Sequence, residues 1–267
     1  MRRDGKKICS LLAVLAFGLL LAAGAAQPER EIAGVGDKAQ NAKTEENRDA
    51  VSDADQGDRL LDSFQIEVDR NRFQIACVGD SITAGAGVEE TGELPYPDIL
   101  QELAGEKVQV HNFGVKGRSL LSTSRWPYRE EGYYQMSLAV SADLYILMLG
   151  SNDIWQESWD GETFQRELVD FVASYQNLES RPVIYLVQPP AYFPAADDAE
   201  GQEKNGYMPE LCQRVAAAAE ETGAGLIDLY TYTRGHPEWF ADEVHPNGEG
   251  NRQIAAFIYR CIRDDLP

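Results

Sequence analysis

The chain has 267 residues, of which 43% are hydrophobic, and a formal net charge of −20 at pH 7. That length and hydrophobic content allow one α/β domain of ordinary size with a sizeable core, plus appendages. The negative charge argues against nucleic acid, which binds basic surfaces, and against an anionic membrane surface, whereas a neutral or cationic substrate is easier to accommodate.

The N-terminus has the layout of a secretory signal peptide. Basic residues at positions 2, 3, 6 and 7 precede the apolar stretch Leu11–Leu21, and small residues follow up to Ala26. We therefore predict a signal peptide over residues 1–26 and a secreted or cell-envelope-associated protein, with no stable membrane insertion after cleavage. The alternative is an uncleaved single-span anchor, although the apolar stretch is shorter than the roughly 20 residues that a span needs.

Residues 27–69 form a predicted flexible acidic linker. The segment is rich in Glu, Asp, Lys, Asn, Gln, Ala and Gly, so it cannot bury enough apolar surface to offset the entropy lost on ordering. Near its end, Phe64, Ile66 and Val68 favour an extra strand that docks on the domain that follows. We assign that single domain to residues 70–267.

Strand-like and helical patterns alternate along this domain. Five short apolar runs are continuous, as in parallel strands buried on both faces: Phe73–Val78, Val108–Asn112, Leu144–Leu149, Val183–Val187 and Leu226–Leu229. Helical patterns lie between and after them, at Tyr96–Leu103, Tyr133–Val140, Phe164–Leu178, Pro209–Glu221 and Gly250–Ile262. The order predicts an α/β fold, a three-layer α/β/α sandwich with a parallel, flavodoxin-like sheet of about five strands joined by right-handed crossovers.

Cysteine is sparse, and three cysteines remain once the predicted signal peptide is removed. An odd, low count is not a disulfide framework. Cys77 lies in an apolar run and is interpreted as a small core residue. A bridge between Cys212 and Cys261 stays open. The sequence has no metal-binding cluster, and we expect no cofactor.

Four polar motifs stand where predicted strands end or where the last helix begins. They are Gly-Asp-Ser-Ile-Thr at 79–83, Asn-Phe-Gly-Val-Lys-Gly at 112–117, Gly-Ser-Asn-Asp at 150–153 and Asp-Glu-Val-His at 242–245. In open α/β sheets, ligands bind outside the carboxyl ends of the strands. We therefore expect these four loops to converge on one site.

Ser81 and His245 are the candidate nucleophile and base. A serine becomes a nucleophile when a base takes its proton, and a histidine oriented by a carboxylate is the usual base. Asp242 stands three residues before His245, so one turn can fold its carboxylate onto the ring. His111 has no nearby acid, and His236 has a threonine at the corresponding position. The alternative for Ser81 is a plain turn residue, but the Asp-x-x-His partner favours an acyl-transfer enzyme.

An attacked ester carbonyl develops negative charge, which needs hydrogen-bond donors fixed in advance. The backbone amide of Ser81 can supply one donor and the Asn152 side chain another. Gly114 and Gly117 lie in a turn where the backbone can approach a ligand closely. Taken separately, the glycines are equally consistent with a plain turn, and Asn152 with a helix cap.

Together, the four motifs resemble the conserved blocks of the SGNH hydrolases, also called GDSL-type esterases and lipases, from about Arg72 to the C-terminus. They occur in the family's order and at fitting distances. The resemblance implies a serine ester hydrolase with Ser81 as nucleophile, His245 as general base and Asp242 as the residue that orients the base.

The resemblance also implies an oxyanion hole built from the Ser81 amide, the Gly117 amide and the Asn152 side chain, with Gly114 structural. The chain departs from the name-giving motif after Ser81, which slightly favours a carbohydrate or small-ester substrate over a long-chain lipid. The role of Arg118 stays open.

Aromatic residues in the loops at the same edge suit sugar rings and acyl chains alike. Trp126, Trp155 and Tyr192 are the candidate substrate contacts, and loop packing is the alternative. We expect a secreted serine esterase that hydrolyses short-chain, acetyl-type esters of a small molecule or glycan. A lysophospholipase or thioesterase of the same family and a non-catalytic glycan-binding module are the alternatives.

Overall fold

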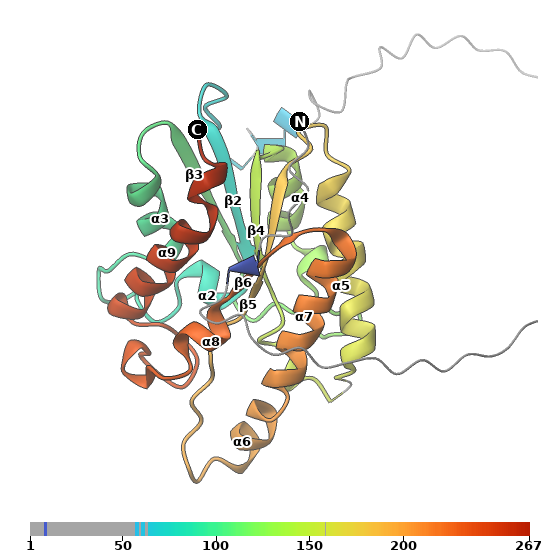
Figure 1. The fold of residues 1–267 in the computed structure, drawn as a ribbon, viewed down its shortest axis with the longest axis vertical. Coiled ribbons are helices and arrows are strands. Elements are labelled where there is room, and N and C mark those ends of the chain that lie inside the picture. The colour runs from blue at the N-terminus through green and yellow to red at the C-terminus, as the bar shows by residue number, and fades with distance from the viewer. Residues whose placement is uncertain (1–7, 10–56, 59, 62–63, 158) are drawn as a thin grey trace, which may run out of the picture.

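The computed structural model describes residues 8–9, 57–58, 60–61, 64–157 and 159–267. Its centre is a parallel sheet in the order β6-β5-β4-β2-β3 (Figure 1), built from β2 (Phe73–Gly79), β3 (Val108–Gly114), β4 (Leu144–Met148), β5 (Val183–Gln188) and β6 (Gly225–Asp228). Numbered along the chain, these five strands have the flavodoxin-like order 2-1-3-4-5, as predicted.

A two-residue strand, β1 (Ile8–Cys9), pairs in parallel with β6 at the edge of the sheet. These two residues lie within the predicted signal peptide. The rest of that segment and most of the predicted linker, residues 1–7 and 10–56, lie outside the described residues.

Helices cover both faces of the sheet, which confirms the three-layer prediction (Figure 1). One face carries α3 (Tyr96–Ala104) and α9 (Gly248–Ile262). The other carries α4 (Gly132–Val140), α5 (Gly161–Gln176) and α7 (Met208–Thr222). Successive side chains of a strand point to opposite faces, so in β2 Ile75 packs under α3 and α9 while Ala76 packs on the opposite side.

Among the α-helices whose bounds lie within the described residues, three short ones have no counterpart in the sequence prediction: α2 (Ser81–Ala84), α6 (Ala199–Asn205) and α8 (Leu229–Thr233). None has the length or apolar repeat from which a helix is recognised. Each instead begins at an aspartate whose side chain accepts a hydrogen bond from a first-turn amide, at Asp80, Asp198 and Asp228.

The outer edge of β3 is met by a side chain from α3. Gln101 donates from Nε2 to the carbonyl of Val108 at 3.0 Å and accepts at Oε1 from the amide of Val110 at 2.9 Å. One amide side chain therefore satisfies a backbone acceptor and a backbone donor of this edge strand.

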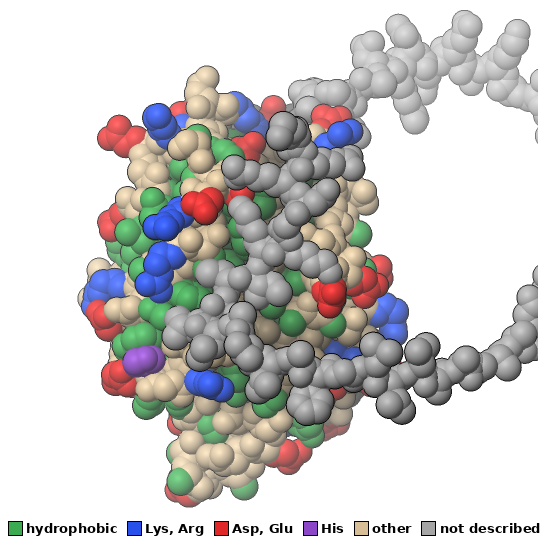
Figure 2. Space-filling view, in the orientation of Figure 1, with side chains coloured by type: hydrophobic (Ala, Val, Ile, Leu, Met, Phe, Trp, Pro, Cys, Tyr) green, Lys and Arg blue, Asp and Glu red, His purple; other side chains and the backbone are tan. Residues whose placement is uncertain are grey.

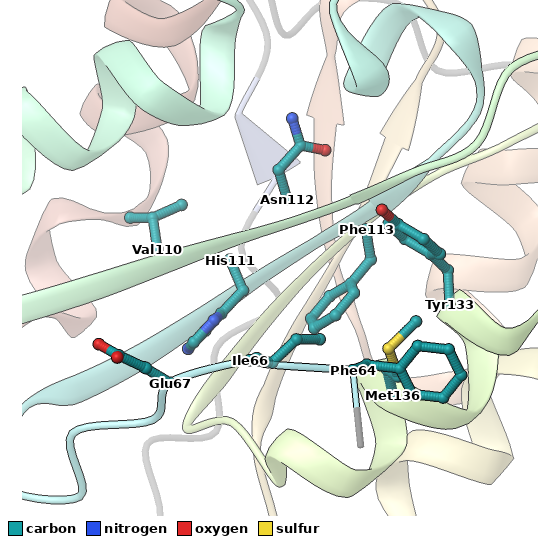
Figure 3. A pocket seen from close by; sticks show the side chains of 9 residues that line it. All are labelled: Phe64, Ile66, Glu67, Val110, His111, Asn112, Phe113, Tyr133 and Met136. Atoms are coloured by element: carbon teal, nitrogen blue, oxygen red, sulfur yellow. The ribbon is translucent and has the colours of Figure 1, made fainter. Parts of the chain in front are cut away.

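The end of the predicted linker packs against the domain. Leu61 is buried in the core, and Ile66 and Val68 pack against it. The segment from Ile66 onward forms no strand; side-chain hydrogen bonds tie it to β3, with Gln109 bonded to the Glu67 carbonyl and the Asp69 amide. Docking is thus observed without the predicted strand pairing. Figure 3 shows the pocket where this segment meets β3, lined by Phe64, Ile66, Glu67, Val110, His111, Asn112, Phe113, Tyr133 and Met136.

Cys77 and Cys212 are buried, free cysteines, so the Cys212–Cys261 bridge that the sequence left open is not formed. No helix among the described residues is long and apolar enough to cross a membrane. On the face shown in Figure 2, acidic and basic side chains are interspersed where the surface is described, so charge of one sign is not gathered into a single patch there.

Candidate active site

The strand order brings the carboxyl ends of β2 and β4 side by side. The chain leaves β2 toward β3 on one side and returns to β4 on the other, which is the kind of switch point where open α/β sheets bind ligands. Ser81 follows β2, and Asn152 follows β4. The contacts below show that the loops carrying all four motifs meet here.

The turn that carries Ser81 requires glycine. A Cβ at Gly79 would lie 2.2 Å from Oγ1 of Thr83, and one at Gly114 would lie 2.1 Å from the Ala84 amide nitrogen. Both glycines thus let α2 sit tightly on the ends of β2 and β3. Ser81 is the first residue of α2, where a helix amide has no partner within its own helix, so its N–H is available to a ligand.

Ser81, His245 and Asp242 form a continuous hydrogen-bonded chain. Ser81 Oγ lies 3.0 Å from Nε2 of His245, and Nδ1 of His245 lies 2.8 Å from Oδ2 of Asp242. The other carboxylate oxygen accepts from the amides of Val244 at 2.8 Å and His245 at 2.6 Å. When Nδ1 of His245 carries the ring proton and donates it in the hydrogen bond to Asp242, Nε2 presents a lone pair to the serine hydroxyl.

The same hydrogen bonds set the charge of Asp242. Partial burial would raise the pKa of its carboxyl, but the bonds from the His245 ring and from the amides of His245 and Val244 together lower the pKa below its ordinary value. Asp242 is therefore ionised at neutral pH.

The other two histidines lie in different surroundings. His111 is buried with Nε2 at 2.8 Å from Oε1 of Gln74, and its burial lowers its pKa to about 4. His236 bonds to Glu238 at 2.9 Å through Nδ1 and stacks on Trp239. An acid thus also accompanies His236, at a spacing the sequence analysis did not consider.

The three predicted oxyanion donors come from three loops. Asn152 Nδ2 donates to the carbonyl of Arg118 at 3.0 Å, which ties its amide to the segment that follows Gly117. Its second contact, to Oδ2 of Asp80, is longer at 3.3 Å. Gly117 has a positive φ of 70°, and a Cβ built on it would meet nothing within 4 Å among the described residues. The space above this turn is open.

Asp80 is fully buried beneath Ser81. Its Oδ1 accepts from the amide of Ile82 at 3.0 Å, and its Oδ2 accepts from the hydroxyl of Ser151 as well as from Asn152. Burial raises the pKa of this carboxyl, against the lowering effect of the hydrogen bonds from Ser151 and Ile82 and of His245. Asp80 thus links the turn after β2 to the turn after β4.

Asp153 is a second fully buried carboxylate that the sequence analysis did not single out. It accepts from the amides of Leu120 at 3.0 Å and Leu121 at 2.8 Å. Burial raises its pKa to about 7, although those amides oppose the rise and the charges of Asp80 and Glu167 add to it. Its place next to Asn152 in the Gly-Ser-Asn-Asp motif could have pointed to a role at the site. Its hydrogen-bond partners, the amides of Leu120 and Leu121, could not be predicted because they lie far away along the chain.

The predicted aromatic contacts divide into two groups. Trp155 and Tyr192 pack edge to face, with ring centroids 5.6 Å apart, and so join the loops after β4 and β5. Trp126 has 53% of its surface exposed, and the guanidinium groups of Arg118 and Arg125 lie over its ring at 5.5 and 5.2 Å. Arg118 also forms an ion pair with Glu131, so this arginine braces the turn after Gly117.

The sequence profile of the GDSL-like lipase/acylhydrolase family matches residues 77–253. An acetylxylan esterase of Xylanibacter ruminicola is 28% identical over 211 residues, which cover 72% of this chain and 43% of the relative. The chain therefore spans less than half the length of that curated relative.

Solved structures share the fold. An aryl esterase of M. smegmatis superposes with a TM-score of 0.57 at 18% identity, covering 73% of this chain and 100% of the other. A carbohydrate acetylesterase family member from Sinorhizobium meliloti gives 0.56 at 22% identity, with 73% and 99% covered. The profile match spans all four motifs and most of the sheet. The chain belongs to the GDSL-like lipase/acylhydrolase family, a family of serine ester hydrolases.

Proposed function

We propose that this protein is a secreted serine esterase that removes short acyl groups, chiefly acetyl, from carbohydrate. The observation that carries the proposal is the continuous chain from Ser81 Oγ through His245 to Asp242, placed at the switch point of the sheet. The arrangement joins a nucleophile, a base and a group that orients the base, which is what acyl transfer requires.

In the acylation step, Ser81 Oγ attacks the ester carbonyl carbon while Nε2 of His245 takes the hydroxyl proton. The carbonyl oxygen becomes an oxyanion that accepts hydrogen bonds from the amides of Ser81 and Gly117 and from Nδ2 of Asn152, which exchanges its longer bond to Asp80 for the oxyanion and keeps its bond to the Arg118 carbonyl. Collapse of this tetrahedral intermediate breaks the bond to the alcohol oxygen, which leaves with the proton from His245. The acyl group remains on Ser81.

In the deacylation step, water attacks the acyl-serine carbonyl and gives its proton to His245. The second tetrahedral intermediate expels Ser81 Oγ, which regains a proton from the imidazolium, and a carboxylic acid is released. Asp242 stays ionised throughout and stabilises the protonated ring. The positive charge on His245 appears only in these steps, so the nearby carboxylate stabilises them differentially.

Two observations support a carbohydrate ester as the substrate. The similar protein from Xylanibacter ruminicola is an acetylxylan esterase. Trp126, which is 53% exposed beside two arginines, and the Trp155–Tyr192 pair offer aromatic surfaces of the kind that pack on sugar rings. Because a family of lipases and esterases uses one catalytic arrangement, substrate choice rests on such loop residues.

A panel of p-nitrophenyl esters of increasing chain length, together with acetylated glycans, tests the proposal. Turnover of acetyl esters and release of acetate from glycan are expected, with loss of both in Ser81→Ala. A preference for long acyl chains would assign the protein to the lipid-directed branch of the family. Binding of glycan without any turnover would leave a binding module.

The location follows from the predicted signal peptide. Mature protein recovered from the medium or envelope of its host should begin near Ala26 or Gln27, which N-terminal sequencing decides. Cleavage there removes β1 and leaves the five strands β2 to β6. Recovery of intact, Met1-containing protein from membranes would instead indicate an anchor.

A further inference from the structure

Two successive residues after β4 hold one short segment of the loop after β3. Asn152 donates to the carbonyl of Arg118 at 3.0 Å, and Asp153 accepts from the amides of Leu120 and Leu121. That segment begins directly after Gly117. The two side chains and the two stretches of backbone therefore close a ring that contains Asn152 and begins one residue after Gly117, the two predicted oxyanion donors that lie outside α2.

The chemistry of Asp153 suits this arrangement. A carboxylate is an acceptor only, so each of its oxygens can take one of two neighbouring N–H groups. An asparagine of the same shape would turn an NH2 group toward one of those amides and leave two donors facing each other. Asp153, Leu120 and Leu121 are all nearly inaccessible to solvent, so water cannot replace a lost bond.

We propose, on the basis of the esterase function proposed above, that Asp153 is a positioning residue that holds the Gly117 amide and the Asn152 side chain in fixed relation, so that both meet the same oxyanion. Asp153 does not touch the substrate in this arrangement. It acts through the Arg118 carbonyl, which anchors Asn152, and through the course of the backbone from Gly117 to Leu121.

The neighbouring contact of Glu167 supplies a matched control. Glu167, on α5, accepts from the amide of Ser122 at 2.7 Å and from its hydroxyl at 3.0 Å. It therefore holds the next amide of the same loop, but nearer the surface and farther from Gly117. Asp153→Asn and Glu167→Gln make the same chemical change at successive points of one loop.

The test is steady-state kinetics on p-nitrophenyl acetate at pH 8, with melting temperatures for every variant. Asp153→Asn should lower kcat about tenfold to hundredfold and change KM by no more than about twofold, because misplaced donors weaken the transition state more than substrate binding. Glu167→Gln should stay within about twofold of wild type in both constants.

A double-mutant cycle distinguishes a positioning role of Asp153 from a general loosening of the fold. If Asp153 acts through Asn152, then Asp153→Asn should cost clearly less in the Asn152→Ala background, by about threefold or more, than in the wild type. If Asp153→Asn only loosened the fold, the reductions in kcat of the two single variants would multiply in the double variant. Should Asp153→Asn fail to fold, Asp153→Ser keeps one acceptor without a buried charge and enters the same cycle.

Unchanged kcat in folded Asp153→Asn, equal losses in Asp153→Asn and Glu167→Gln, or fully multiplicative effects with Asn152→Ala would each overturn the positioning role. Ser81→Ala and Asn152→Ala keep the two hypotheses apart. If both are impaired while Asp153→Asn is not, the esterase proposal stands and the role of Asp153 fails. If Asn152→Ala is unimpaired, the oxyanion assignment itself fails, and with it this inference.

Discussion

The Asp242 and His245 loop and the buried carboxylates Asp80 and Asp153 meet around Ser81, but they are built in opposite ways. The Asp242 side chain is 47% exposed, and its bonds reach no farther than the next three residues. Asp80 and Asp153 are fully buried and bond to loops that are distant in sequence. In the proposed mechanism, the first region carries out proton transfer, and the second holds the groups that stabilise the negative charge of the oxyanion.

The difference indicates which of the two regions can tolerate small structural changes. The exposed loop can move slightly and still keep its short-range bonds, since the groups involved lie on one turn. The buried region cannot, because every polar group lost there leaves a partner without water to replace it. Four sets of measurements test this contrast, in order of decreasing expected effect.

The largest effect should come from loss of Ser81 Oγ. Replacement of the Ser81 hydroxyl in Ser81→Ala removes the nucleophile and should lower kcat on the order of 10^6. The residue is only partly buried, so the melting temperature should stay close to that of the wild type. Near-wild-type turnover in purified, folded protein would sink the assignment of Ser81.

A comparison of two histidines examines the exposed region. His245→Ala should lose about as much activity as Ser81→Ala, because the base and the nucleophile act as a unit. His236→Ala is the control, since His236 also bonds to an acid but stacks on Trp239. It should keep most of the activity. The reverse pattern in hydrolysis of p-nitrophenyl acetate would mean that the base is His236.

Asn152→Ala probes the buried region at its boundary with the substrate. Loss of one oxyanion donor should lower kcat by about 10^2 to 10^3 and leave KM little changed, because the bond forms mainly in the transition state. A variant that only loosened the loop would raise KM and lower the melting temperature together. An unaffected kcat would remove Asn152 from the site.

The smallest effect is a dependence of stability on pH. The raised pKa of Asp153, about 7 against an ordinary value of 3.8, means that the folded protein holds an extra proton between these values. Its contribution to the free energy of unfolding is therefore greatest below about pH 4 and is lost as the pH rises to about 7, by at most about 1.4 kcal/mol per pH unit.

Urea denaturation of the wild type and of Asp153→Asn at pH 5 and pH 8 measures this contribution. The stability of the wild type relative to the variant should fall between the two pH values. Asp242→Asn should show no such trend there, because the lowered pKa of Asp242 places its contribution above the ordinary value, to be lost only in acid. A relative stability that rises toward pH 8 would contradict the buried, proton-retaining state of Asp153.

The fold was largely predictable, because parallel strands buried on both faces leave continuous apolar runs. All five such strands lie within two residues of their predicted ends. The short helices were not predicted, since α6 has no apolar repeat and begins at the Asp198 cap. The docking of Leu61 on the core was also missed, because a single leucine in a polar segment carries no periodic signal.

The contacts of the site divide into short-range bonds in the exposed loop and long-range bonds among the buried carboxylates. The bond between Asp242 and His245 spans three residues, so its geometry follows from the sequence alone. The bond from Ser151 to Asp80 spans 71 residues and those of Asp153 span 32 and 33, so no local pattern announces them. Family resemblance suggested roles for Ser81, Gly117 and Asn152, and the predicted roles of these residues await the kinetic tests above.

Gln101 has a consequence for how the molecule behaves among its own copies. A sheet ends in a row of unpaired amides and carbonyls, which can template the strand of another chain and begin aggregation. By bonding Val108 and Val110, the Gln101 side chain takes the place that a neighbouring strand would occupy. The Val108 carbonyl and the Val110 amide are therefore not free to pair with the strand of a second molecule, which disfavours association of copies through this part of the edge.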